Sequence, residues 1–213
     1  MPVKKLTPNQ SIFRWLYYFP SRCVGKLIKS YINRRYPGLD LDAEVDKQTG
    51  LLFDYLAKPV FLEIVRRTPF QNNEIHFLDA GCGKGNVLVF ARKCRFAQVA
   101  GVELSDKFFT VCESNMRILG LDDVILFHRD ATLLESELDA FNVIYMYNPF
   151  PEEVLRKFLL CLKESVTRKP RRICVAYANP VYATVLIEMG FRETQRFEME
   201  TYYYLNTAAL YEL

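Results

Sequence analysis

Three glycines at alternate positions follow an apolar segment that ends in an aspartate. Gly81, Gly83 and Gly85 come directly after Asp79-Ala80. Glycine has no Cβ, so the backbone at these positions can approach a ligand closely and can adopt positive φ angles. Open α/β sheets bind their ligands at the carboxyl ends of the strands. The residues therefore predict a ligand-binding loop, with a glycine-rich turn that holds no ligand as the alternative.

The glycine spacing separates two classes of cofactor. A dinucleotide-binding loop has the pattern G-x-G-x-x-G/A. Here the third glycine comes one residue early, and Asn86 occupies the position of the small residue. The chain also offers no assignable catalytic pair for hydride transfer. An NAD-dependent oxidoreductase is therefore disfavoured.

The segment Asp79-Ala80-Gly81-Cys82-Gly83-Lys84-Gly85 resembles motif I of the class I S-adenosylmethionine (AdoMet) dependent methyltransferases. This resemblance implies that AdoMet is the cofactor and that Asp79 and the three glycines bind it. The closest resemblance is to small, poorly characterised members with a Tyr-x-Pro-Thr-Pro-Tyr segment before the first strand. Tyr55 and Pro59 match that segment, and Lys58 replaces its threonine.

Two later acidic residues match further family positions. Glu103 resembles the acidic residue that ends the second strand and binds the ribose, and its two oxygens match a vicinal diol. Leu104 then stands where an apolar side chain flanks the adenine. Asp130, in Arg129-Asp130-Ala131, matches the acidic residue near the adenine amino group. The alternatives are a capping role for Glu103 and a structural loop role for Asp130.

The segment Asn148-Pro149-Phe150 resembles the Asn/Asp-Pro-Pro-aromatic motif of amine-directed methyltransferases. The resemblance implies that Asn148 and the following carbonyl hold the target N–H groups, and that Phe150 packs on a planar group. Phe150 replaces the second proline of the motif, which weakens the case for a nucleobase acceptor. Two alternatives are a tight turn before a helix and a contact of Asn148 with the methionine part of AdoMet.

Alternating apolar runs and amphipathic segments predict the elements that position these residues. Such alternation is typical of a doubly wound α/β sheet covered on both faces, and the resemblance implies seven mainly parallel strands. A C-terminal antiparallel hairpin is expected from 191–203 and 207–213, with Leu205-Asn206 as its turn. The predicted strands are 75–80, 98–103, 124–128, 141–147 and 173–177; the predicted helices follow Pro59 and span 86–95, 105–119, 152–166 and about 181–189.

The N-terminal segment differs in charge from the rest of the chain. Residues 1–39 contain eight Lys or Arg and no acidic residue, whereas the 213-residue chain has a net charge of +3. The apolar side chains between Cys23 and Ile32 recur at helical spacing. We therefore expect a basic amphipathic helical arm or lid at 1–45 and an AdoMet-binding domain at 46–213. The arm alternatively contacts nucleic acid or a membrane surface.

These features predict an AdoMet-dependent methyltransferase that acts on an amine nitrogen of a protein side chain or small molecule. An RNA or DNA methyltransferase that uses residues 1–39, and a non-catalytic AdoMet-binding regulatory protein, are the alternatives. No apolar run reaches the length of a transmembrane segment. The six scattered cysteines lack metal-site spacing, so we expect no metal and a reducing, cytoplasmic location.

Overall fold

The computed structural model describes residues 34–40, 44–45, 52–53, 58–200 and 205–213. Most of the predicted basic arm, including its apolar stripe, lies outside these residues, as does Tyr55. No helix in the described ranges is long and apolar enough to span a membrane.

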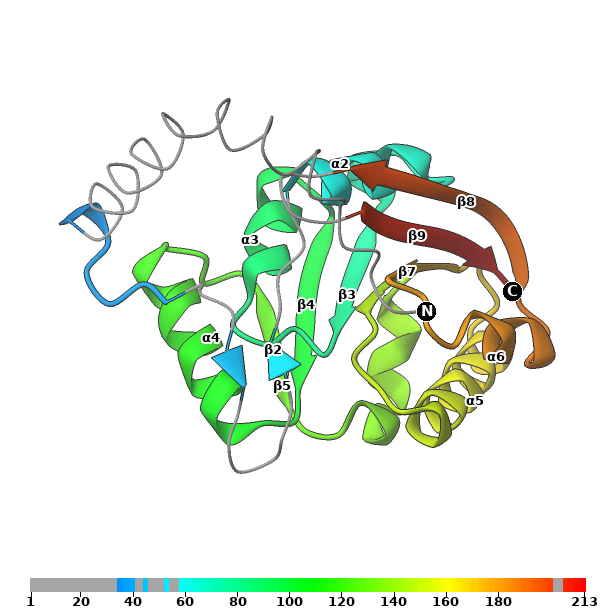
Figure 1. Cartoon of the computed structure of the whole chain (residues 1–213). Helices are drawn as coiled ribbons and strands as arrows, with labels where there is room; N and C mark the ends of the chain where they lie inside the picture. Colours follow the sequence, from blue (N-terminus) through cyan, green and yellow to red (C-terminus); the bar gives the residue numbers. More distant parts are fainter. Residues whose placement is uncertain (1–33, 41–43, 46–51, 54–57, 201–204) are drawn as a thin grey trace.

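A seven-stranded sheet forms the centre of the molecule (Figure 1). Its strand order is β5-β4-β3-β6-β7-β9-β8, and β9 pairs antiparallel with both of its neighbours while the other pairs are parallel. The predicted fold class is therefore confirmed. The strands are β3 (His76–Ala80), β4 (Gln98–Glu103), β5 (Ile125–His128), β6 (Val143–Tyr147), β7 (Cys174–Ala178), β8 (Arg192–Glu200) and β9 (Leu205–Glu212).

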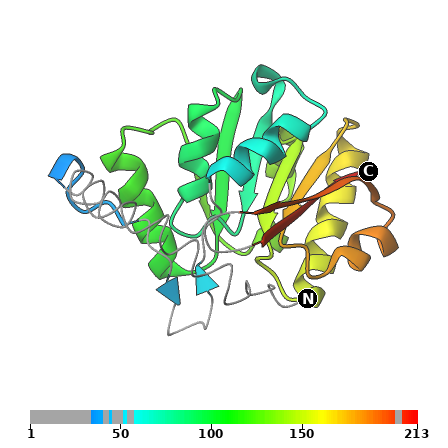
Figure 2. The ribbon, with the colours of Figure 1, turned by 45° about the horizontal axis from the view of Figure 1, so that its top comes forward.

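Helices cover both faces of this sheet (Figure 2). One buried cluster joins the sheet to α2 (Lys58–Arg67), α3 (Asn86–Lys93) and α4 (Asp106–Ile118). A second cluster joins the opposite face to α5 (Glu152–Arg168) and α6 (Ala183–Glu188). The near-continuous apolar strands of the sequence are explained by this burial on two sides.

Local signals fix several of the boundaries. Ser105 caps α4 as predicted, because its side chain accepts a hydrogen bond from the backbone N–H of Phe108. Gly120 follows α4 with φ of +63°, a left-handed conformation that ends helices.

The prediction of a turn at Leu205-Asn206 is wrong. Both residues belong to β9, where they pair with Glu200 and Met199 of β8. The Asn206 side chain also donates a hydrogen bond to the Met199 carbonyl oxygen. Pairing across the hairpin therefore outweighs the preference of asparagine for turns, and the connection falls at 201–204, outside the described residues.

Several short elements were not predicted. They are the two-residue strands β1 (Glu44–Val45) and β2 (Leu52–Phe53), which pair antiparallel, and the 3₁₀ helices Asn72–Glu74, Ala131–Leu133 and Ser136–Ala140. They are shorter than the windows in which hydrophobic periodicity can be recognised.

Candidate active site

The glycine loop connects β3 to α3 and is fixed to the neighbouring strand. The backbone N–H groups of Gly81 and Cys82 donate hydrogen bonds to the Val102 carbonyl oxygen at 2.9 and 3.0 Å. Gly81, Gly83 and Gly85 have φ angles of +83°, +54° and +88°, which other residues rarely adopt. The predicted loop conformation is thus set by the glycines themselves.

Gly85 is also required by packing. A Cβ at this position would lie 2.8 Å from both Cys112 Sγ and Met116 Cε of α4. The absence of a side chain therefore lets α4 pack directly against the start of α3 and holds the loop at the carboxyl edge of the sheet.

Glu103 ends β4 beside this loop and is buried. Its Oε2 accepts a hydrogen bond from the Gly83 N–H, and its Oε1 accepts one from the Ser105 N–H, both at 2.8 Å. Burial raises the pKa of the Glu103 carboxyl, and the backbone hydrogen bonds partly oppose this effect. A carboxylate has about four acceptor sites, and the backbone N–H groups of Gly83, Leu104 and Ser105 use three of them, so the Glu103 carboxylate keeps capacity for a ligand hydroxyl group.

Asp79 lies in β3, two residues before Gly81, and is only 3% exposed. Burial, and then the nearby charge of Glu103, raise the pKa of the Asp79 carboxyl well above its ordinary value. No cationic side chain among the described residues forms an ion pair with either carboxylate. Two acidic groups thus share a buried site that a positively charged ligand would stabilise.

The Asn148-Pro149-Phe150 turn follows β6 and touches the glycine loop. A Cβ at Gly81 would lie 2.5 Å from Pro149 Cβ, so glycine permits this close approach. Asn148 has a φ of +44°, and the Tyr177 hydroxyl donates a hydrogen bond to its Oδ1 at 2.8 Å. The structure therefore brings two of the predicted site segments together and fixes the orientation of the Asn148 amide.

A family model described as a methyltransferase domain matches residues 77–167. This range runs from β3 through most of α5 and contains the glycine loop, both acidic strand ends and the Asn-Pro-Phe turn. The glycine loop and the strand order both agree with this match to a methyltransferase domain. Residues 77–167 therefore belong to a methyltransferase domain.

Solved structures with the same fold are similar to this methyltransferase at low sequence identity. A SAM-dependent methyltransferase from Aquifex aeolicus is 18% identical, with a TM-score of 0.55 over 72% of this chain and 88% of the other. A ribosomal protein L11 methylase from Lactobacillus delbrueckii subsp. bulgaricus is 20% identical, with a TM-score of 0.53 over 81% of each chain.

An RNA methyltransferase from Salinibacter ruber, in complex with S-adenosyl-L-homocysteine, is 13% identical, with a TM-score of 0.55 over 75% of this chain and 93% of the other. A search of curated proteins gives no match. These similarities support the fold of the methyltransferase domain.

The two remaining predicted cofactor contacts lie on separate strand ends of the methyltransferase. Leu104, directly after Glu103, is 56% exposed and so offers an apolar surface to a ligand. Asp130 caps the 3₁₀ helix Ala131–Leu133, because its Oδ1 accepts hydrogen bonds from both the N–H and the hydroxyl of Thr132 at 2.8 Å. The structural role of Asp130 is therefore present, and its contact with adenine stays a prediction.

The methyltransferase also contains a buried polar clasp that the sequence did not reveal. Lys84, inside the glycine loop, is 1% exposed and forms an ion pair with Asp40 at 2.7 Å. Asn115 of α4 donates hydrogen bonds to the carbonyl oxygens of both Asp40 and Lys84. The C-terminal end of the predicted arm is thus bound to the glycine loop.

Two buried tyrosines of the site were missed as well. Tyr177 orients Asn148 from the adjacent strand, and Tyr145 lies beside Asp79 in the register of β3 and β6. In the sequence both read as ordinary apolar strand residues. Only the β6–β7 and β3–β6 pairings place them at the site.

Proposed function

We propose that this methyltransferase transfers the methyl group of AdoMet to an amine nitrogen of a protein side chain or of a small molecule. The observation that carries this proposal is the Asn148-Pro149-Phe150 turn, which packs against the cofactor loop at Gly81. A methyl group held over the loop and an acceptor held by the turn would be neighbours.

Residues at the carboxyl edge of the sheet are proposed to hold the cofactor. AdoMet carries an ammonium and a sulfonium group, which fit a site with buried carboxylates and no cation paired to them among the described residues. NAD, with its anionic pyrophosphate, fits this site poorly. The proposed cofactor contacts are Asp79, Gly81, Gly83, Gly85, Glu103, Leu104 and Asp130.

The Asn148-Pro149-Phe150 turn offers hydrogen-bond acceptors that can hold the N–H groups of an amine. Asn148 Oδ1 has one acceptor site left after its bond from Tyr177, and the next backbone carbonyl adds a second acceptor. These groups can hold two N–H bonds so that the nitrogen lone pair faces the methyl group. Phe150 packs on Phe158 of α5 with ring centroids 5.5 Å apart and offers a partly exposed ring to the acceptor.

Little further chemistry is required from the protein. The sulfonium group of AdoMet supplies the activated methyl group, and the protein contributes binding, orientation and exclusion of water. Holding the two reactants in line can supply several kcal/mol of the barrier reduction. A neutral amine then needs no strong general base.

A nucleic acid acceptor is the second candidate. The charge of residues 1–39 favours it, because this segment contains eight basic residues and no acidic residue. Several phosphate contacts would make binding fall steeply as salt rises, whereas binding of a small amine would change little. On this alternative, residues 1–39 bind the substrate; on the favoured proposal, residues 1–45 form a lid on the methyltransferase domain, which spans 46–213.

The six cysteines are scattered without the spacing of a disulfide framework, and we include a reducing, cytoplasmic location in the proposal.

The experiment is a transfer assay with tritiated methyl-AdoMet and three acceptor panels: Lys-, Arg- and amino-terminal peptides, small primary and secondary amines, and total RNA. The proposal predicts label in base-stable N-methyl groups of a peptide or amine. Base-labile methyl esters, or label confined to RNA, would contradict it.

The Asn148→Ala variant provides the residue-level test with the acceptor so identified. We expect its kcat to fall at least tenfold, while its affinity for S-adenosylhomocysteine stays within twofold of the wild-type value. An unchanged kcat with intact cofactor affinity would refute the role of Asn148.

A further inference from the structure

Tyr145 carries a buried hydroxyl group that the fold does not use. The residue lies in β6, is 1% exposed, and its hydroxyl has no hydrogen-bond partner among the described residues. Its ring is well packed, since it stacks on Phe77 with centroids 6.0 Å apart and meets the edge of Phe61 at 6.1 Å. The ring therefore has a structural role, whereas the oxygen has none in the free protein.

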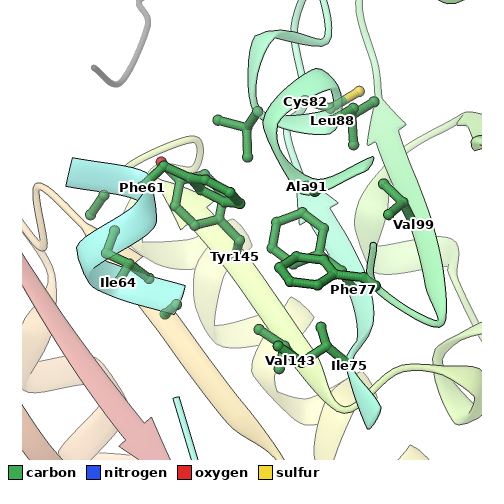
Figure 3. Close-up of a cluster of buried hydrophobic side chains, with 14 of the residues drawn as sticks. Phe61, Ile64, Ile75, Phe77, Cys82, Leu88, Ala91, Val99, Val143 and Tyr145 are labelled. Atoms are coloured by element: carbon green, nitrogen blue, oxygen red, sulfur yellow. The ribbon is translucent and has the colours of Figure 1, made fainter. Parts of the chain in front are cut away.

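The hydroxyl points toward the beginning of α2. Figure 3 shows the Tyr145 oxygen beside Phe61, which lies in the first turn of that helix. The first N–H groups of a helix have no acceptor within the helix and carry partial positive charge. The first turn of α2 contains no acidic residue. A phenol O–H and the positive end of a ten-residue helix are thus directed to one place.

Asp79 borders the same place. It pairs with Tyr145 in the parallel register of β3 and β6, so both side chains lie on the same face of the sheet. Burial, and then the Asp79 charge, raise the pKa of the Tyr145 hydroxyl above its ordinary value. The arrangement therefore offers a carboxylate for a cation and, beside it, the Tyr145 O–H and the positive end of α2 for an anion.

An α-amino acid carries this pair of charges on one carbon. We propose that Tyr145 is a cofactor-binding residue whose hydroxyl donates a hydrogen bond to the α-carboxylate of the methionine part of AdoMet, with the first turn of α2 beside it and Asp79 at the ammonium group. This inference rests on the AdoMet assignment. It gives a function to a hydroxyl group at a position where phenylalanine would fill the same space.

The test compares three ligands by calorimetric titration of the full chain and its Tyr145→Phe variant. S-adenosylhomocysteine has both charges, S-adenosyl-3-thiopropylamine keeps the ammonium and lacks the carboxylate, and 5′-methylthioadenosine lacks both. We expect the variant to bind S-adenosylhomocysteine about tenfold more weakly, as expected for loss of a hydrogen bond to a charged group. Its affinities for the other two ligands should stay within twofold of the wild-type values.

Thermal unfolding without ligand gives a second readout. Because the hydroxyl has no partner in the free protein, Tyr145→Phe should leave the Tm unchanged or raise it. The matched control is Tyr211→Phe, which also alters a fully buried tyrosine but removes a hydrogen bond to Arg196 on β8. This control should lower the Tm and leave all three affinities unchanged.

Two results would overturn the inference: an unchanged affinity of Tyr145→Phe for S-adenosylhomocysteine, or an equal loss of affinity for all three ligands. Failure of the wild-type chain to bind any of them would instead contradict the AdoMet assignment itself. The two failures are therefore distinguishable.

Discussion

Replacing Asp79 with asparagine should stabilise the free protein and weaken cofactor binding. Burial and the Glu103 charge raise the pKa of the Asp79 carboxyl in the folded state. Between its ordinary pKa and the raised one, the folded protein therefore holds more protons than the unfolded chain. The free energy of unfolding then falls as pH rises, by up to about 1.4 kcal/mol per pH unit for this one group.

The Asp79→Asn variant has no carboxyl group at this position, so it does not lose stability in this way as the pH rises. Above the ordinary pKa of aspartate, we expect Asp79→Asn to be more stable than the wild type, by an amount that grows with pH and becomes constant above the raised pKa. Its affinity for S-adenosylhomocysteine should fall about tenfold to a hundredfold, because a hydrogen bond between charged groups contributes about 1.5–3 kcal/mol.

Urea denaturation between pH 4.5 and 8 measures this difference. The control is Asp139→Asn, since hydrogen bonds from Arg168 and Ser165 lower the pKa of the Asp139 carboxyl. A carboxyl group with a lowered pKa stabilises the fold above its ordinary pKa, and this stabilisation is lost in acid. Asp139→Asn removes the stabilisation, so this control should be less stable than the wild type at neutral pH. The reasoning would be refuted if Asp79→Asn were less stable than the wild type and if its free energy of unfolding changed with pH in the same way as that of the wild type.

Three further outcomes are expected. Gly85→Ala should destabilise the fold by about 2–4 kcal/mol in urea denaturation, because a positive φ is combined with Cβ contacts of 2.8 Å. The control Gly120→Ala has a positive φ but open space around its Cβ, so it should lose only about 1 kcal/mol. Asp40→Asn should cost about 2 kcal/mol in the same assay, since the buried Lys84 ammonium loses its ion pair with Asp40, and a loss below 0.5 kcal/mol would contradict this view of the clasp. Tyr177→Phe should lower kcat about fivefold by freeing the amide of the Asn-Pro-Phe turn, with cofactor affinity unchanged; an equal loss in both would indicate a general disturbance of the site.

Local sequence signals predicted the elements whose causes are local. The glycines of the loop, the Ser105 cap and the near-continuous apolar strands each express a short-range requirement of the backbone or of burial. These signals located the sheet, most of its helices and the segments at its carboxyl edge. They failed at Leu205-Asn206, where pairing with β8 decides the conformation of a residue that by itself favours a turn.

The missed parts of the site depend on contacts between distant residues. Lys84 and Asp40 are 44 positions apart, and Tyr177 and Asn148 are 29 apart. Tyr145 is inconspicuous in an apolar strand, and its hydroxyl becomes informative only when its neighbours are known to lack a hydrogen-bonding group for it. Periodicity and motif spacing contain no information about such pairs.

The most direct measurement is calorimetric titration of the full chain with S-adenosylhomocysteine and, separately, with NAD. The account predicts micromolar binding of S-adenosylhomocysteine, no binding of NAD, and loss of binding in a Glu103→Ala variant that still unfolds cooperatively. Binding of NAD, or no binding of S-adenosylhomocysteine by the folded chain, would contradict it.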